Sequence, residues 1–349
     1  MDLKSLINKI GIKQQEKENK ALGIYIENSS QNKEKLETLL SEFKKIISDK
    51  AAPTLWMSIG IDGYYDYISK KINNFDFDIK NVNLLTNDMS LYDTIRSDDR
   101  ENTEFGLFLS VLINKNLKAG EKVQITTSIP VDYLFYKLEN VETHVNIAGR
   151  YLGSEAKNSK IYADEAGDGA GESMENCELH VKKAGEDLGD DAKNSKIYAD
   201  EAGDGAGKYM KKCELHIRKA YNYLGNSAKN SKIYADEAGD NTGESMERCE
   251  LHVKTADDSL GSRAKNSKIY ADKAGDNTGE FMENCKLYVK EVYYNLGDSA
   301  KNSKIYADDL EGNLAGNILK GNNTVYLGKE SYEKFPEYHG KVKIWEKKT

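Results

Sequence analysis

Four cysteines in this chain could in principle bind a metal or act as nucleophiles, and they recur at one fixed spacing. They lie 36 residues apart, at Cys177, Cys213, Cys249 and Cys285. The interval is twice a shorter 18-residue repeat, so successive cysteines belong to alternate turns of that repeat. If each turn adds a parallel strand about 4.8 Å from the last, they lie roughly 9.6 Å apart. A disulfide needs Cα atoms within about 7 Å, and a shared zinc or iron–sulfur site is excluded by the same distance. We therefore expect buried structural thiols, with no metal and no cofactor.

Four of the five histidines fall in a second series, in which histidine and tyrosine mostly alternate at every eighteenth position. Histidines in alternate turns lie too far apart to share a metal, and the intervening tyrosine breaks any proton relay. We expect an external stack of rings and no catalytic residue. The functional alternative is a flat stripe that docks a partner, since tyrosine suits interfaces. The series is His144, Tyr162, His180, Tyr198, His216, Tyr234, His252, Tyr270, Tyr288 and Tyr306.

A glycine ladder sets the spacing of both series. An 18-residue interval fits one coil of a solenoid, a chain that returns to the same corner on each turn. Glycine at that corner indicates a positive φ or a lack of room for a Cβ. Ten coils, starting at residues 138, 156 and every eighteenth residue to 300, predict a stack roughly 48 Å tall. The ladder is Gly153, Gly171, Gly189, Gly207, Gly225, Gly243, Gly261, Gly279 and Gly297.

Each coil contains one strand with period-2 alternation, such as 159–163 (SKIYA) and 177–181 (CELHV). Ser, Ile and Ala of one coil and Cys, Leu and Val of the next face inward. Coils with small core residues such as Ala156 alternate with coils that carry large ones such as Met174. Large-on-small stacking fills a narrow core without voids.

Charges on the outer side alternate in sign from coil to coil, which predicts control of register and not chemistry. A slip of one coil would place like charges together. One row is Lys160, Glu178, Lys196, Glu214, Lys232, Glu250 and Lys268, and the other is Asp164, Lys182, Asp200, Arg218, Asp236, Lys254, Asp272, Lys290 and Asp308. The first row breaks at Lys286, which leaves Lys268, Lys286 and Lys304 in succession. This run is either drift in a late repeat or a small basic patch that binds an anion or a partner.

A left-handed hexapeptide helix also has 18-residue coils, but its aliphatic residue at every sixth position is absent here. Parallel crossovers favour the right-handed form. Runs such as 166–177 (AGDGAGESMENC) resemble the GXGXG right-handed β-helix that ends the glutamate synthase large subunit and forms the formylmethanofuran dehydrogenase C subunit. The resemblance covers about residues 138–317. This chain has Asn176-Cys177 where that family has Gly-Gly. The resemblance implies a scaffold, with flavin, iron–sulfur or metal chemistry residing in other domains or subunits.

The expected fold class is thus an all-β right-handed parallel β-helix behind a small α/β or α+β N-terminal domain. The domains are 1–118, a first strand and cap at 119–137, the β-helix at 138–317 and a C-terminal cap at 318–349. In the N-terminal part we expect helices at 3–17, 32–50 and 103–114 and strands at 22–26, 54–59 and 123–129. The acidic stretch 97–101 is expected to be a solvated loop. Strands at 324–327 and 341–347 should close the far end, because exposed terminal coils invite aggregation.

The 349-residue chain has a net charge of −8, with lysines and carboxylates interspersed, and 38% hydrophobic residues. Such a surface has no general attraction for nucleic acid or an anionic membrane. Residues 1–20 lack the apolar segment of a signal peptide, and we expect a cytoplasmic protein. We predict a non-enzymatic scaffold or interaction protein that binds another protein. A second copy of the chain, in a homo-oligomer, is one such partner. The alternatives are a structural subunit of a redox enzyme complex and an enzyme within residues 1–118.

Overall fold

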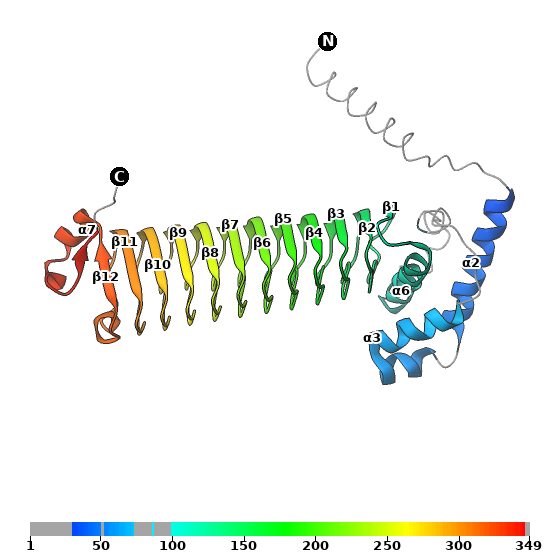
Figure 1. Ribbon diagram of the computed structural model, residues 1–349, viewed down its shortest axis with the longest axis horizontal. Helices are drawn as coiled ribbons and strands as arrows, with labels where there is room; N and C mark the ends of the chain where they lie inside the picture. Colours follow the sequence, from blue (N-terminus) through cyan, green and yellow to red (C-terminus); the bar gives the residue numbers. More distant parts are fainter. Residues whose placement is uncertain (1–29, 50–51, 73–85, 87–98, 346–349) are drawn as a thin grey trace, which may run out of the picture.

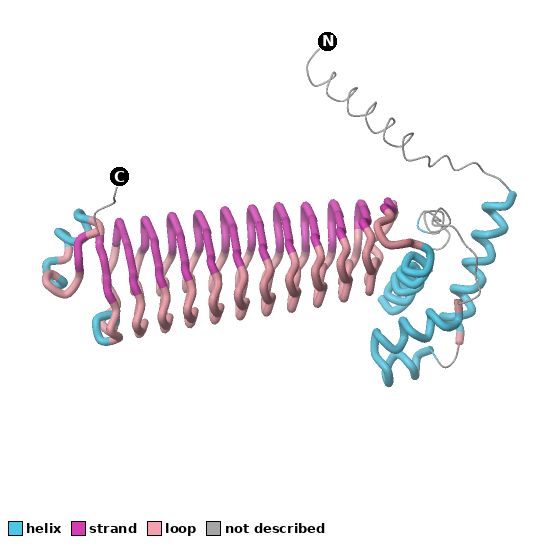
Figure 2. The backbone as a smooth tube through the Cα atoms, viewed as in Figure 1, coloured by secondary structure: helices cyan, strands magenta, loops and turns pink. Residues whose placement is uncertain are grey.

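A long stack of parallel strands dominates the structure (Figure 1). The computed structural model describes residues 30–49, 52–72, 86 and 99–345. Its single sheet has thirteen strands that pair strictly in chain order from β1 to β13, and neighbouring strands are parallel throughout. Each strand is followed by a loop segment that returns the chain to the start of the next one (Figure 2). The parallel β-solenoid that the 18-residue repeat predicts is confirmed.

The register follows the repeat. In β3 and β4 Lys160 pairs with Glu178 and Ile161 with Leu179, which are equivalent positions of neighbouring repeats. The offset is longer between β11 and β12, where Lys304 pairs with Thr324. The strands are β1 Lys122–Ile125, β2 Glu142–Ile147, β3 Lys160–Ala166, β4 Glu178–Ala184, β5 Lys196–Ala202, β6 Glu214–Ala220, β7 Lys232–Ala238, β8 Glu250–Ala256, β9 Lys268–Ala274, β10 Lys286–Val292, β11 Lys304–Leu310, β12 Thr324–Leu327 and β13 Lys343–Ile344.

The solenoid core has the predicted alternation of small and large coils. Ala156, Met174, Ala192 and Met210 lie at successive levels of one column, and each is fully buried. The inward strand positions Ile161 and Leu179 are fully buried as well. A narrow core filled in this way leaves each coil in contact chiefly with the coils above and below it.

The corner requires glycine for both of the expected reasons, a positive φ and a lack of room for a Cβ. Gly189 has φ +70°, in the left-handed region that other residues rarely adopt. A Cβ there would also lie 2.3 Å from the Cδ1 of Ile197. Other positions of each coil are left-handed too, which the repeat does not predict, among them Ser173 and Asn176, with φ of 55° and 54°.

The four cysteines are buried structural residues, as predicted, and they belong to a hydrogen-bonded ladder with serines. The Ser159 amide donates to the Cys177 Sγ at 3.4 Å, and the Cys177 amide donates to the Ser195 Oγ at 3.0 Å. The alternation continues to Ser303, whose amide donates to the Asn323 Oδ1 at 2.9 Å. Burial raises the pKa of the Cys177 thiol to about 11.

The described residues before 119 form helices, namely α2 Ser30–Ser48, α3 Ala52–Lys71 and α6 Asp99–Asn116. The helices predicted at 32–50 and 103–114 are confirmed. The strand predicted at 54–59 is wrong, because this stretch forms the first part of α3, before a kink at Gly60. Beyond the kink the buried residues Tyr64 and Ile68 are four positions apart, which is helical spacing.

Three further expectations need correction or fall outside the structure. Asp99, Arg100 and Glu101 form the first turn of α6 and not a loop, and a carboxylate such as that of Glu101 is favourable near a helix N-terminus. The strand predicted at 123–129 ends at Ile125. The elements predicted at 3–17 and 22–26, with residues 97–98 and 346–347, lie outside the described residues.

Both ends of the stack carry different structures, as expected for caps. Helix α6 packs on the first coil, where the Ser110 Oγ donates to the Tyr133 carbonyl at 2.8 Å and the Asn102 Nδ2 to the Pro130 carbonyl at 3.0 Å. At the other end, the short helix η1 Ile318–Lys320 precedes β12. Two more short helices, α7 Lys329–Lys334 and η2 Pro336–Tyr338, lie between β12 and β13. The predicted strand at 324–327 is confirmed, and that at 341–347 is present only as β13.

Candidate functional site

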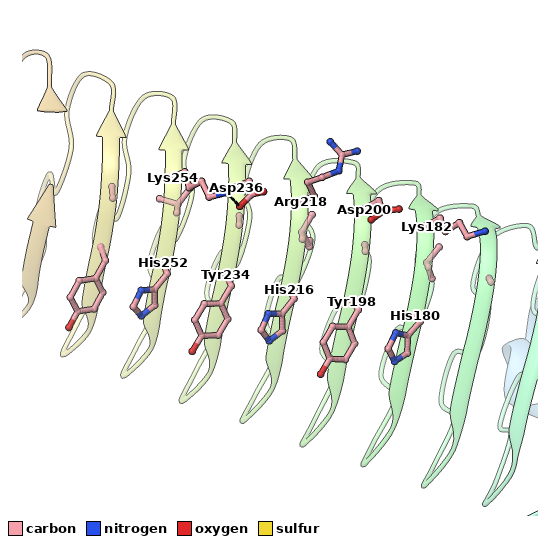
Figure 3. A pocket seen from close by; sticks show the side chains of 18 of the residues that line it. His180, Lys182, Tyr198, Asp200, His216, Arg218, Tyr234, Asp236, His252 and Lys254 are labelled. Carbon is pink, nitrogen blue, oxygen red and sulfur yellow. Dashed lines mark ion pairs between the residues drawn. The ribbon is translucent and has the colours of Figure 1, made fainter. Parts of the chain in front are cut away.

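The strands β2 to β11 present one continuous outer face, which we define by three rows of side chains. The first charged row contains residue 160 and its equivalents in the other coils, the aromatic row contains residue 162 and its equivalents, and the second charged row contains residue 164 and its equivalents. Figure 3 shows the aromatic row and the second charged row side by side on adjacent strands. All of the interaction-stripe residues predicted from the sequence lie in the aromatic row.

The aromatic row is a continuous stack of rings. Neighbouring ring centroids from His144 to Tyr306 lie 4.4–5.1 Å apart, with interplanar angles of 4–17°. The stack extends to Tyr326, 4.5 Å beyond Tyr306, and Trp345 lies edge-on to Tyr306 at 5.5 Å. Because neighbouring rings cover each other's flat faces, the row presents ring edges to solvent. This geometry does not suit sugars or bases, which stack on open ring faces.

Each stacked histidine pairs with a glutamate of its own strand, which the sequence analysis missed. The Nε2 of His180 lies 2.7 Å from the Oε1 of Glu178, and the equivalent distances are 2.9 Å at His216 and 3.0 Å at His252. The hydrogen bond from His180, followed by that from Lys160, lowers the pKa of Glu178. The signal was present as a Glu-x-His pattern, which places both side chains on one side of a strand.

This pairing explains where the charge alternation breaks. In β10 the glutamate position is occupied by Lys286 and the histidine position by Tyr288, so both members of the pair are replaced together. Lys286 then pairs in register with Lys268 on one side and Lys304 on the other. All three side chains are exposed. The predicted basic patch is therefore a real group of adjacent lysines, beside a run of stacked tyrosines.

The second charged row contains alternating ion pairs with one interruption. The lysine Nζ and aspartate Oδ1 atoms form ion pairs at 2.6 Å between Lys182 and Asp164 and at 2.7 Å between Lys254 and Asp236. The same pair recurs at 2.5 Å between Lys290 and Asp272. Among the described residues, no ion pair joins Asp200 to Arg218, although they occupy the same positions in β5 and β6. In Figure 3 the Arg218 side chain points past the end of its strand, and no dashed line joins it to Asp200.

A groove of about 1220 Å³ runs along the stack between the aromatic row and the second charged row. Its lining extends from Gln124 near the first coil to Trp345 near the last, and inward-facing residues such as Ala163 and Val181 contribute to it. One side of the groove is formed by ring edges and the other by alternating charges. The groove has no net charge of one sign along its length, so it does not favour a uniform polyanion or polycation.

A second, smaller group of titratable residues joins α3 to the first coil. The Tyr136 hydroxyl lies 3.0 Å from Asp62 and 3.0 Å from Glu155, and Lys137 also pairs with Asp62. Burial and these carboxylates raise the pKa of Tyr136. Although burial opposes it, the hydrogen bond to Asp62 raises the pKa of Lys137. Because both groups then stay protonated at neutral pH, the cluster acts as an ion-pair network between the helices and the solenoid.

Among the residues that the structure describes, no group of three or more His, Cys, Asp or Glu side chains could hold a metal ion. The same residues include no helix that is long and apolar enough to cross a membrane. The cysteine series is enclosed in the core and the histidine series lies on the outer face, so the structure does not bring the two together.

Searches against models of protein families, curated proteins and solved structures find no match to this chain. A function must therefore be inferred from the geometry of the outer face itself.

Proposed function

We propose that this protein is a non-enzymatic interaction protein that uses the outer face of its solenoid to dock a protein partner. The observation that carries the proposal is the continuous, ordered face itself, in which stacked rings and charged rows border a groove along the whole stack. Backbone pairing to both neighbouring strands fixes the position of each residue of the face along and across the sheet. A rigid, preorganised surface loses little conformational entropy on binding.

The chemistry of the face favours a protein over other partners. Ring edges, hydroxyls and charges of both signs suit a mixed polar interface, in which tyrosine and arginine are enriched. A uniform polyanion would meet carboxylates at every second coil. The basic patch at Lys268, Lys286 and Lys304 is confined to three adjacent strands and adds a local preference for acidic groups.

Site-specific photo-crosslinking tests the proposal. A photoreactive phenylalanine analogue is placed at Tyr198 on the outer face, and in a matched variant at Tyr293, which is 44% exposed outside that face. We expect crosslinks to a protein at position 198 and few or none at position 293. Equal crosslinking at both positions would contradict docking by the outer face.

The same experiment separates the proposal from a role in a redox enzyme. Crosslinked partners that carry flavin, iron–sulfur or molybdopterin groups would favour the alternative of a structural subunit. An enzyme in the N-terminal region would instead require turnover by the purified full chain, which we do not expect.

A further inference from the structure

We infer that the outer face of β2 to β9 docks a second copy of this chain, with the two solenoid axes antiparallel. This inference rests on the proposed docking function and names the partner. The face is self-complementary in charge and in shape about a two-fold axis that lies between β5 and β6 and runs along the strands.

Charge complementarity follows from how the rows alternate. Such an axis keeps each row opposite the same row of the other copy but reverses the order of the strands, so β5 meets β6, β4 meets β7, β3 meets β8 and β2 meets β9. In the first charged row every contact then joins opposite charges. The facing pairs are Lys196 with Glu214, Glu178 with Lys232, Lys160 with Glu250, and Glu142 with Lys268.

The second charged row obeys the same rule. Asp200 faces Arg218, Lys182 faces Asp236, and Asp164 faces Lys254, and only the outermost contact, Asn146 with Asp272, is neutral. The two rows therefore support the same arrangement of the two copies.

The alternation also specifies the register between the copies. If one copy slides by one strand, the axis passes through a strand and like charges face each other in both rows, which costs free energy at each contact. A slide by two strands restores opposite charges near the axis. In one direction, however, it sets Lys160 of β3 against Lys286 of β10, and in the other it sets β8 against the short strand β1 and leaves β9 without a partner. Only the axis between β5 and β6 pairs all the strands from β2 to β9 with one another, and it does so without a like-charge contact in either row.

Shape complementarity selects the antiparallel arrangement over a parallel one. A two-fold axis parallel to the solenoids would set tyrosine against tyrosine and histidine against histidine. The antiparallel arrangement sets each longer tyrosine against a shorter histidine, as with Tyr198 and His216. Strict alternation of histidine and tyrosine covers β2 to β9 and ends where Tyr270 is followed by Tyr288. The centre of that segment is the boundary between β5 and β6.

The interrupted ion pair lies at the same centre. Asp164 and Lys182, like Asp236 and Lys254, are paired within the chain at 2.6 Å and 2.7 Å. Asp200 and Arg218 are the two residues of this row nearest the proposed axis, and no ion pair joins these two described residues within the chain. In the dimer, Asp200 of each copy lies opposite Arg218 of the other, so this contact occurs twice.

The available area matches a specific but reversible dimer. Eight strands about 4.8 Å apart and five residues wide cover about 600 Å² per copy, or about 1,200 Å² in total. This is the lower limit of specific interfaces, and it corresponds to a dimer that dissociates on dilution.

Sedimentation velocity on the full chain, from about 1 to 100 µM, tests the inference. We expect a monomer–dimer equilibrium that shifts toward monomer as salt screens the charged rows. The variants Asp200→Arg and Arg218→Asp should each weaken dimerisation at least about 10-fold, because each sets like charges against each other twice. An equimolar mixture of the two variants should dimerise again, since both contacts then join opposite charges. Lys212→Glu is the matched control, because Lys212 is exposed in the turn before β6 and outside the face.

Disulfide trapping tests the arrangement. Tyr198→Cys mixed with His216→Cys should give a crosslinked heterodimer on oxidation, whereas neither variant should crosslink efficiently with itself. A wild-type monomer at every concentration, a dimer unaffected by either charge variant, or self-crosslinking of each cysteine variant would overturn the inference. A monomeric protein whose position 198 still crosslinks to a different protein would overturn only the inference and leave the proposed function standing.

Discussion

The repeated coils and the N-terminal helices bury their residues by different means. In the coils, each buried residue stacks between the equivalent residues of the two neighbouring coils, so Ala156 lies in the same buried column as Met174. In the helical region, buried residues meet from segments far apart in the sequence, as where Phe43 of α2 contacts Phe105 of α6 at 5.3 Å between ring centroids. Periodic burial is therefore local along the solenoid axis, whereas burial among the helices depends on long-range packing.

The largest effect that would test this comparison comes from deleting a fully buried side chain in a middle coil. Leu215→Ala should lower the free energy of unfolding by about 2–5 kcal/mol, because it leaves a cavity in a packed core. Hydrogen exchange should show lost protection in β5 to β7 and nearly unchanged protection in β2. The matched variant Leu109→Ala, equally buried in α6, should expose amides of the helices and first coil instead. Uniform loss of protection in both variants would contradict local burial.

A smaller effect is expected where the helices meet the first coil. A Cβ on Gly106 of α6 would lie 1.6 Å from the Asp132 backbone carbonyl oxygen. Since backbone must shift to admit it, Gly106→Ala should cost about 1–3 kcal/mol and loosen the cap. Thermal unfolding followed by circular dichroism measures this. Gly316→Ala, where no atom lies within 4 Å of the added Cβ, should leave the midpoint unchanged. Equal midpoints for the two variants would show that α6 does not pack tightly on the coil.

The contribution of the Glu–His pairs to folding stability should be smaller still, and it should depend on pH. The hydrogen bond from His180 holds the pKa of Glu178 below its ordinary value of 4.5. A carboxylate whose pKa is lower in the folded state contributes stability that is present above its ordinary pKa. That contribution is lost as the pH falls through the folded-state pKa. Glu178→Gln should lower stability by less than about 1 kcal/mol near pH 6, and the difference should shrink as the pH falls below the ordinary pKa of the carboxyl. A difference that does not change with pH would assign it to packing and not to charge.

The smallest effect concerns the cysteines, for which we expect almost no reaction in the folded protein. Burial raises the pKa of the Cys177 thiol to about 11 and also raises those of the other three thiols. At pH 8 a thiol-specific disulfide reagent should therefore react with the four cysteines only after unfolding in urea. Rapid reaction of one thiol in the native protein would show that its coil opens.

The success of sequence reasoning differed between the two regions for the same physical reason. The coil register, the small and large core columns and the ring stack follow from the 18-residue spacing, because equivalent residues contact each other. The strand expected at 54–59 failed because a short apolar run suits either a strand or a helix, and tertiary packing decides between them. The Glu178–His180 pair is visible in the sequence as a two-residue spacing, but the charge pattern there predicts only contacts of the glutamates with neighbouring coils.

The residues alone specify the 18-residue coil, the order in which the coils stack, and the separate columns of cysteine and histidine. These are consequences of periodicity, in which one local rule is applied at every turn. The folded arrangement is needed to show that α6 caps the first coil, that a groove runs beside the ring edges, and that Asp200 and Arg218 do not pair. Those features depend on side-chain directions and on contacts between distant segments, which a repeat period does not specify.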